Sequence, residues 1–269
     1  MTRVERVSDL SAPGVAPYAG LRDRDLRGRG DVFVAEGEVV LRVLASRSRF
    51  RIRSLLLSEK RLAALEDVLA SLPDDVIAYV APQSVMDAIV GFSIHRGVLA
   101  LAERGPARDA RELLAAIPPG PALVVALAGV TNHDNVGGIF RNAAAFGVRA
   151  VIVDQETCDP LYRKSVRVSV GGALVVPFAR AKDAYEIVEI SKASGFEPLA
   201  LSPRGREELG AVSAPRAVLV LGAEGPGLAE DVLAQTRTVR VDMSGELDSL
   251  NVAVTSGIAL YLASRTRTP

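Results

Sequence analysis

Three glycines surround a single carboxylate at the end of an apolar run in the last quarter of the chain. Residues 217–221 have the continuous apolar composition of a strand buried on both faces. Residues 222–227, which follow, read Gly-Ala-Glu-Gly-Pro-Gly. Glycine lets a backbone turn sharply and approach a ligand closely. A loop of this kind around Glu224 can therefore bring its backbone close to a ligand.

A second polar loop follows and leads into the last helix. Residues 238–241 have the pattern of a short strand, and residues 242–249 form the loop after it. Apolar residues then recur every three or four positions, as on one face of a helix, at Leu250, Val254, Ile258, Tyr261 and Leu262. Ser249 stands where an N-cap is expected, and Asp248 adds negative charge at the positive end of that helix. The two loops are therefore predicted to line one crevice.

A third polar group opens a helix predicted at residues 135–146, directly after the apolar strand predicted at residues 122–128. At about 100° per residue, Ile139 and Ala143 share the core face of this helix, whereas Arg141 points away from it. Taken alone, Arg141 is interpreted as a surface residue of an amphipathic helix.

Together the three segments resemble the motifs of the SpoU/TrmH-type RNA ribose methyltransferases, within the SPOUT superfamily. Residues 135–141 read Asn-Val-Gly-Gly-Ile-Phe-Arg and match motif one. Residues 222–228 match motif two, and residues 249–254, reading Ser-Leu-Asn-Val-Ala-Val, match motif three. Three motifs in the right order are far more specific than any one of them.

The resemblance implies an α/β fold. Its C-terminal domain would be a parallel-sheet SPOUT domain with a deep trefoil knot, and its smaller N-terminal α/β domain would be similar to ribosomal proteins and bind RNA. It also implies a homodimer that binds S-adenosylmethionine and methylates a ribose 2′-hydroxyl. Because the sulfonium is already a good leaving group, no metal is expected. Residues 91–97 resemble part of the substrate-binding domain of ribosomal-RNA-directed relatives, which favours ribosomal RNA over transfer RNA.

The resemblance further assigns individual residues. Those expected at the reacting groups are Asn135, Arg141, Glu224, Ser249 and Asn251. Those expected around the methyl donor are Leu221, Gly222, Gly225, Val241, Met243, Leu250 and Ala253. The two asparagines would hold loops and substrate, Glu224 would lock the glycine-rich loop, and Ser249 would cap the last helix and face the pocket. Arg141 is proposed in the family to act on the 2′-hydroxyl. Since a guanidinium is normally protonated, a role as base and a role in positioning the phosphate and hydroxyl both stay open.

Composition limits the other possibilities. The chain has 269 residues, 49% of them hydrophobic, so a sizeable core is expected. The formal net charge is zero, which gives no bulk argument for nucleic acid. A single cysteine, Cys158, excludes an internal disulfide, and two histidines leave few metal ligands. The sequence lacks an apolar run long enough to span a membrane, and residues 1–10 lack the apolar core of a signal peptide, so a cytoplasmic protein is expected.

Gly-Pro and Pro-Pro-Gly-Pro breakers divide the chain. We predict an RNA-binding domain at residues 1–105, a linker at 106–121 and the methyltransferase domain at 122–269. Residues 1–30 are interpreted as irregular. Strands are predicted at residues 32–35, 52–57, 76–80, 98–101, 122–128, 148–153, 198–201, 217–221 and 238–241. Helices are predicted at residues 37–45, 59–72, 83–90, 110–117, 135–146, 162–170, 181–194 and 250–262.

Two segments concentrate positive charge. Residues 42–53 contain five arginines and no acid, and residues 162–182 contain Arg163, Lys164, Arg167, Arg180 and Lys182, again with no acid. Such clusters are either solvated faces or phosphate contacts, and the sequence leaves both interpretations open.

Alternatives to the methyltransferase stay open at this point. A non-catalytic RNA-binding module could keep the same fold, and transfer RNA could be the methylated substrate. A dinucleotide-dependent oxidoreductase would suit a parallel sheet, but its glycine fingerprint after the first strand is missing. Two departures from the family, His133 and Asp242 where proline is common, affect loop shape and bear on the choice of substrate.

Overall fold

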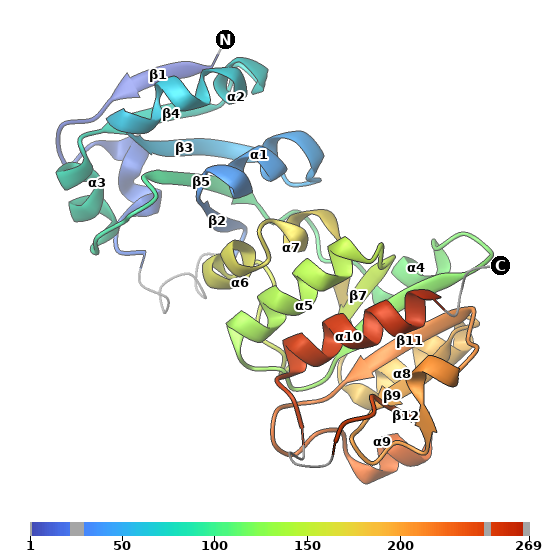
Figure 1. Ribbon diagram of the computed structural model, residues 1–269. Coiled ribbons are helices and arrows are strands. Elements are labelled where there is room, and N and C mark those ends of the chain that lie inside the picture. Colours follow the sequence, from blue (N-terminus) through green and yellow to red (C-terminus); the bar gives the residue numbers. More distant parts are fainter. Residues whose placement is uncertain (1, 22–29, 245–248, 266–269) are drawn as a thin grey trace. The chain divides into compact units, whose positions relative to one another are not determined.

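The computed structural model describes residues 2–21, 30–244 and 249–265, and the chain forms two compact units (Figure 1). Unit 1 contains Met1–Pro106 together with Leu161–Val175, and unit 2 contains Ala107–Pro160 together with Val176–Pro269. Among the described residues, no helix is long and apolar enough to cross a membrane.

Unit 1 is built on a mixed five-stranded sheet with the order β1-β4-β3-β5-β2. Its strands are β1 Arg3–Arg6, β2 Val32–Glu36, β3 Ile52–Ser58, β4 Ile77–Ala81 and β5 Val98–Glu103. β1, β4 and β3 are parallel, whereas β5 is antiparallel to both β3 and β2. The helices of this unit are α1 Glu38–Arg47, α2 Glu66–Ser71, α3 Gln83–Val90, α6 Arg163–Val168 and α7 Gly172–Val175. α6 packs against β2, and α7 packs against α1.

The core of unit 1 is largely apolar and includes a hydrogen-bonded pair of hydroxyl groups. Apolar side chains of the sheet pack against α3 and against the 3-10 helix Pro13–Tyr18. Tyr18 is fully buried there, and its hydroxyl is 2.8 Å from the Ser54 hydroxyl. Burial raises the pKa of Tyr18 above its usual value. The buried hydroxyl thus has the partner that a polar group inside a core requires.

Unit 2 contains a parallel seven-stranded sheet with the order β10-β12-β9-β11-β6-β7-β8. Its strands are β6 Ala122–Leu127, β7 Ala150–Val153, β8 Phe178–Arg180, β9 Glu197–Leu201, β10 Glu207–Glu208, β11 Arg216–Leu221 and β12 Arg237–Arg240. Every residue of β6 is buried, as expected for a central strand covered on both faces. The α/β architecture and the parallel sheet predicted from the sequence are confirmed.

Within the described residues, the α-helices that accompany this sheet are α4 Ala110–Ala115, α5 His133–Ala145, α8 Ala184–Ala193, α9 Glu230–Ala234 and α10 Val252–Arg265. α5 and α10 lie side by side (Figure 1). Their close approach depends on Gly138, because a Cβ at this position would lie 2.8 Å from the Cβ of Ala253. Asn142 of α5 ties the helices together, donating to the Ala253 carbonyl at 2.8 Å and to the Ser256 hydroxyl at 2.9 Å.

Several predicted elements need correction. β1 lies in the region interpreted as irregular; it is an edge strand with mostly exposed side chains and is held by backbone pairing with β4. The helix predicted at 59–72 is two 3-10 turns followed by α2, because the buried Leu65 leaves helical geometry with φ −116°. The helix predicted at 162–170 is α6 alone; Val170 has φ 52°, and α7 begins after it. β8 and β10, with three and two residues, were not predicted.

Candidate functional site

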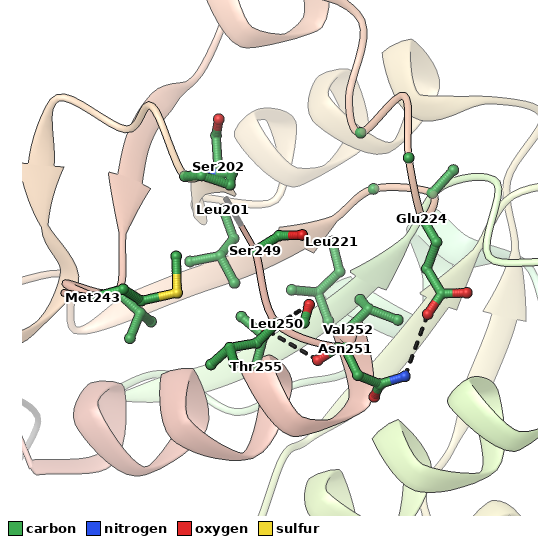
Figure 2. Close-up of a pocket in the computed structure, with 16 residues that line it drawn as sticks. Leu201, Ser202, Leu221, Glu224, Met243, Ser249, Leu250, Asn251, Val252 and Thr255 are labelled. Atoms are coloured by element: carbon green, nitrogen blue, oxygen red, sulfur yellow. Dashed lines mark hydrogen bonds between the residues drawn. The ribbon is translucent and has the colours of Figure 1, made fainter. Parts of the chain in front are cut away.

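The carboxyl ends of β9, β11 and β12 meet at one edge of the unit 2 sheet, and the loops that follow them enclose a pocket of about 350 Å³. Figure 2 shows side chains of these loops and of the start of α10 converging on this space. The pocket is lined by Leu201, Ser202, Pro203, Leu221, Gly222, Ala223, Glu224, Gly225, Gly227, Val241, Met243, Ser249, Leu250, Asn251, Val252 and Thr255. Ligands of open parallel sheets bind at this edge.

The glycine-rich loop after β11 folds back on itself beside the pocket. The Gly227 amide donates to the Ala223 carbonyl at 3.1 Å, which closes the turn. A Cβ at Gly222 would lie 2.6 Å from the carbonyl carbon of Gly227 and 2.7 Å from the amide nitrogen of Leu228. Because both of these are backbone atoms, a larger residue at position 222 would force the loop open.

Two asparagines and one glutamate from the three motif segments form a closed hydrogen-bonded triangle. The Asn135 amide donates to Glu224 Oε1 at 2.5 Å. The Asn251 amide donates to Asn135 Oδ1 at 2.9 Å. It also donates to Glu224 Oε1 at 3.3 Å (Figure 2). Asn135 is only 4% exposed, so leaving its side-chain amide unpaired would cost stability. The triangle fixes both loops relative to α5.

Asn251, and not Ser249, caps the last helix. Its Oδ1 accepts from the backbone amides of Ala253 at 2.9 Å and Val254 at 3.2 Å. The predicted cap at Ser249 is therefore wrong by two positions, although Ser249 does line the pocket. Asp248, expected to support that cap, lies outside the described residues. Similarly, Asn132 caps α5 by accepting from the Asp134 amide at 2.8 Å.

The residues expected around the methyl donor gather at this pocket with one exception. Leu221, Gly222, Gly225, Val241, Met243 and Leu250 all line it. Ala253 does not; its Cβ faces Gly138, and its carbonyl accepts from Asn142, so it packs α10 onto α5. The sequence interpretation missed Leu201, Ser202 and Pro203. The signal for them was the strand order, since β9 lies between β11 and β12 and therefore ends at the same edge.

Arg141 lies outside the pocket. It is exposed on α5 and, among the residues that the structure describes, forms no hydrogen bond or ion pair. The orientation predicted from the helix angles is correct, because Ile139 and Ala143 are fully buried on the opposite face. Its guanidinium is therefore available to a ligand or to a second chain.

The loop that leads into α5 is held by a buried carboxylate that the sequence interpretation did not use. Asp154, 5% exposed, accepts from the Gly129 amide at 2.9 Å and from the Thr157 amide at 2.7 Å. Thr157 in turn accepts from the Val130 amide at 3.2 Å. These bonds fix the chain between β6 and motif one, and so position Asn135.

The two basic clusters are largely engaged within the chain. In the first, Arg42 pairs with Glu38 and Asp67, Arg51 with Asp75, and Arg53 with Glu103. In the second, Arg163 and Arg167 both pair with the buried Glu36 of unit 1, and Arg180 donates to the carbonyls of Asp154 and Thr157. Counting arginines and lysines along the sequence therefore overstates the positive charge that is available to bind phosphate.

Within the described ranges, no three histidine, cysteine or acidic residues are grouped to hold a metal ion.

Comparisons with known proteins agree with this geometry. The model of the SpoU rRNA Methylase family matches residues 122–261. An uncharacterized tRNA/rRNA methyltransferase of Mycobacterium tuberculosis is 41% identical over 274 residues, covering 97% of this chain and 92% of that protein. The 23S rRNA (guanosine-2′-O-)-methyltransferase RlmB of Acinetobacter baylyi is 32% identical over 192 residues, covering 70% and 77%. The solved SpoU methyltransferase AviRb of Streptomyces viridochromogenes, in complex with the cofactor AdoMet, has a TM-score of 0.77 at 25% identity, over 94% of this chain and 97% of that one.

Proposed function

The chain belongs to the SpoU rRNA methylase family, and from that premise we propose that it transfers a methyl group from S-adenosylmethionine to a ribose 2′-hydroxyl in structured RNA. Ribosomal RNA is the proposed substrate class, because RlmB of Acinetobacter baylyi is named for 23S rRNA. Transfer RNA is the second candidate, since the Mycobacterium tuberculosis relative is named for both.

The pocket beside the glycine-rich loop carries the proposal. It combines apolar walls from Leu201, Leu221 and Leu250 with bare backbone at the glycines, which suits a flat heteroaromatic ring and its ribose. Its volume of about 350 Å³ is within the range of pockets that hold small cofactors. AviRb, whose solved complex contains AdoMet, has the same fold, which further supports this ligand.

When bound, the donor would supply an electrophilic methyl carbon: the ribose oxygen would bond to this carbon as the carbon–sulfur bond breaks, the donor would leave as a thioether, and the hydroxyl proton would pass to solvent water. The protein has mainly to align oxygen, methyl and sulfur, since such positioning alone can supply a large part of the rate. Asn135, Glu224 and Asn251 would hold the pocket loops in the aligned geometry through their hydrogen-bonded triangle. Ser249, which lines the pocket, would face the substrate.

Arg141 is proposed to bind the phosphate beside the target ribose and to polarise its hydroxyl. Because it does not line the pocket of its own chain, we propose a homodimer in which one protomer supplies Arg141 to the pocket of its partner. The apolar residues Val254 and Tyr261 on α10 support this dimer, being 54% and 48% exposed. We also propose that the chain of unit 2 forms a trefoil knot and that the protein acts on RNA in the cytoplasm.

The test is transfer of radiolabelled methyl groups from S-adenosylmethionine to total RNA, followed by alkaline hydrolysis. A 2′-O-methyl group blocks cleavage of the adjacent phosphodiester, so the label should appear in alkali-stable dinucleotides, whereas base methylation would label mononucleotides. Arg141→Ala should keep donor binding and lose transfer by a factor on the order of 10² to 10⁴. Label in mononucleotides, or RNA binding without transfer, would overturn the proposed reaction, the latter in favour of a binding module.

A further inference from the structure

Unit 1 contains a second pocket, of about 370 Å³, that the proposed reaction does not use. It lies between the turn after β3 and the segment that joins α3 to β5. Its lining is polar and includes Ser58, Lys60, Arg61, Asp87, His95 and Arg96. The lining contains no phenylalanine, tyrosine or tryptophan, the larger rings on which bases stack, and its polar groups suit a phosphate better than a base.

The cations of this pocket are available, unlike the arginines of the linear clusters. Among the described residues, the exposed side chains of Lys60 and Arg96 form no ion pair or hydrogen bond. Arg61 is fixed by donating to the Arg96 carbonyl at 3.1 Å and lies 3.9 Å from Glu38. Asp87, the carboxylate of the pocket, already accepts from the Gln83 amide at 2.8 Å and from the Ile94 backbone amide at 2.9 Å. Positive charge is therefore in excess here.

The Ser58 hydroxyl lines the same pocket. Ser58 is 2% exposed as a whole residue, and its hydroxyl forms no hydrogen bond within the part of the chain that the structure describes. The hydroxyl lies against Gly97, where φ is +63° and a Cβ would come within 2.4 Å of it. Because it lines the pocket and is not used by the described chain, this hydroxyl can donate to a ligand oxygen.

We propose that this pocket binds a phosphodiester of the RNA backbone, at a nucleotide other than the one that is methylated. The inference rests on the proposed function in taking RNA as the substrate. Lys60 and Arg96 would neutralise the phosphate, and the Ser58 hydroxyl would donate to one of its oxygens. Such a contact increases affinity and positions the RNA, but it does not distinguish one base sequence from another.

The test measures binding of the full chain to in vitro transcribed 23S rRNA by filter retention over a series of KCl concentrations. Lys60→Ala and Arg96→Ala should each weaken binding by about tenfold, as expected for loss of a charge-assisted hydrogen bond. Each should also reduce the slope of log K against log[KCl] by about 0.7 to 0.9. Ser58→Ala should weaken binding by a few-fold and leave the salt slope as it is.

The matched control is Arg47→Ala, which removes the same charge from an exposed position of unit 1 outside the pocket, where the side chain has no partner among the residues described. It should bind like the wild type. Wild-type affinity and slope in the Lys60 and Arg96 variants, an equal loss in the control, or no RNA binding by the wild type would overturn the inference. S-adenosylmethionine titration and methyl transfer, measured in parallel, separate it from the proposed reaction. Weakened RNA binding in the pocket variants of a chain that never transfers methyl groups would support this pocket and overturn the reaction.

Discussion

The two pockets differ in how completely their polar groups are satisfied within the chain. In unit 2, Asn135, Glu224 and Asn251 pair with one another, and the rest of the lining is mainly glycine backbone and apolar side chains, together with the hydroxyl residues Ser202, Ser249 and Thr255. In unit 1, Lys60, Arg96 and the Ser58 hydroxyl have no partner among the described residues. The first arrangement suits a small ligand held by shape, and the second suits a charged polymer held by salt-sensitive contacts.

This difference predicts which kind of substitution each pocket tolerates. A pocket built from backbone turns should be sensitive to added volume and insensitive to salt. A pocket built from free cations should tolerate added volume better and respond to charge and ionic strength. Single substitutions can separate sensitivity to added volume from sensitivity to charge and ionic strength.

The largest effect is expected from Gly222→Ala. Its Cβ would lie within 2.7 Å of backbone atoms of both Gly227 and Leu228, so the glycine-rich loop has to shift. Overpacking of this kind costs about 1 to 3 kcal/mol, which is up to about 100-fold in affinity for S-adenosylmethionine measured by calorimetry. RNA binding should stay at the wild-type level.

Gly225→Ala is the control for that substitution, because no atom lies within 4 Å of its added Cβ. Its positive φ of 89° still disfavours alanine, so a loss of donor affinity of about tenfold or less is expected. Equal losses in the two variants would show that backbone strain, and not the close approach at Gly222, governs the loop.

Mixed dimers test whether one protomer completes the pocket of the other. Arg141→Ala should lose transfer, and Gly222→Ala should bind the donor weakly, so each should be nearly inactive alone at a donor concentration far below the Kd of the Gly222→Ala variant. A mixed dimer would contain one intact pocket facing one intact Arg141. Random mixing in equal amounts should restore about a quarter of the wild-type transfer rate, because half the dimers are mixed and each has one working site. No recovery, with mixed dimers shown to form, would place Arg141 at its own chain's pocket.

A smaller effect is expected at Glu224, and it separates charge from hydrogen bonding. Glu224→Ala leaves the amides of Asn135 and Asn251 without their shared acceptor, which should cost about 1 to 3 kcal/mol of stability and lower methyl transfer by about tenfold or more. Glu224→Gln keeps an acceptor oxygen and should stay within a few-fold of wild type in melting and transfer assays. If Glu224→Gln loses as much stability and methyl transfer as Glu224→Ala, then the negative charge of Glu224, and not its hydrogen bonding, is what matters.

The sequence predicted the elements around the unit 2 pocket well, because its strands are continuous apolar runs and its loops carry glycine and polar motifs. The sequence-based prediction failed where hydrogen bonding to a neighbouring strand decides whether a segment becomes a strand. β1 has no apolar face and exists through its backbone bonds to β4, which no local pattern records. The loop after β9 was overlooked because only the sheet order places Ser202 and Pro203 beside the glycine-rich loop.

Caps and charges were the least predictable parts of the site. Ser249 and Asn251 are both good N-cap residues, and only the position where α10 begins decides between them. Arginines close together in the sequence proved to have acidic partners far away, as with Arg51 and Asp75 or Arg53 and Glu103. Conversely, Lys60 and Arg96 are 36 positions apart in the sequence and share a pocket.

The most direct test of the central claim is a map of 2′-O-methylated nucleotides in ribosomal and transfer RNA from cells with and without the gene. The account predicts that one ribose methylation disappears on deletion, returns with the wild-type gene and does not return with Arg141→Ala. An unchanged map after deletion, or full restoration by the Arg141→Ala variant, would contradict it.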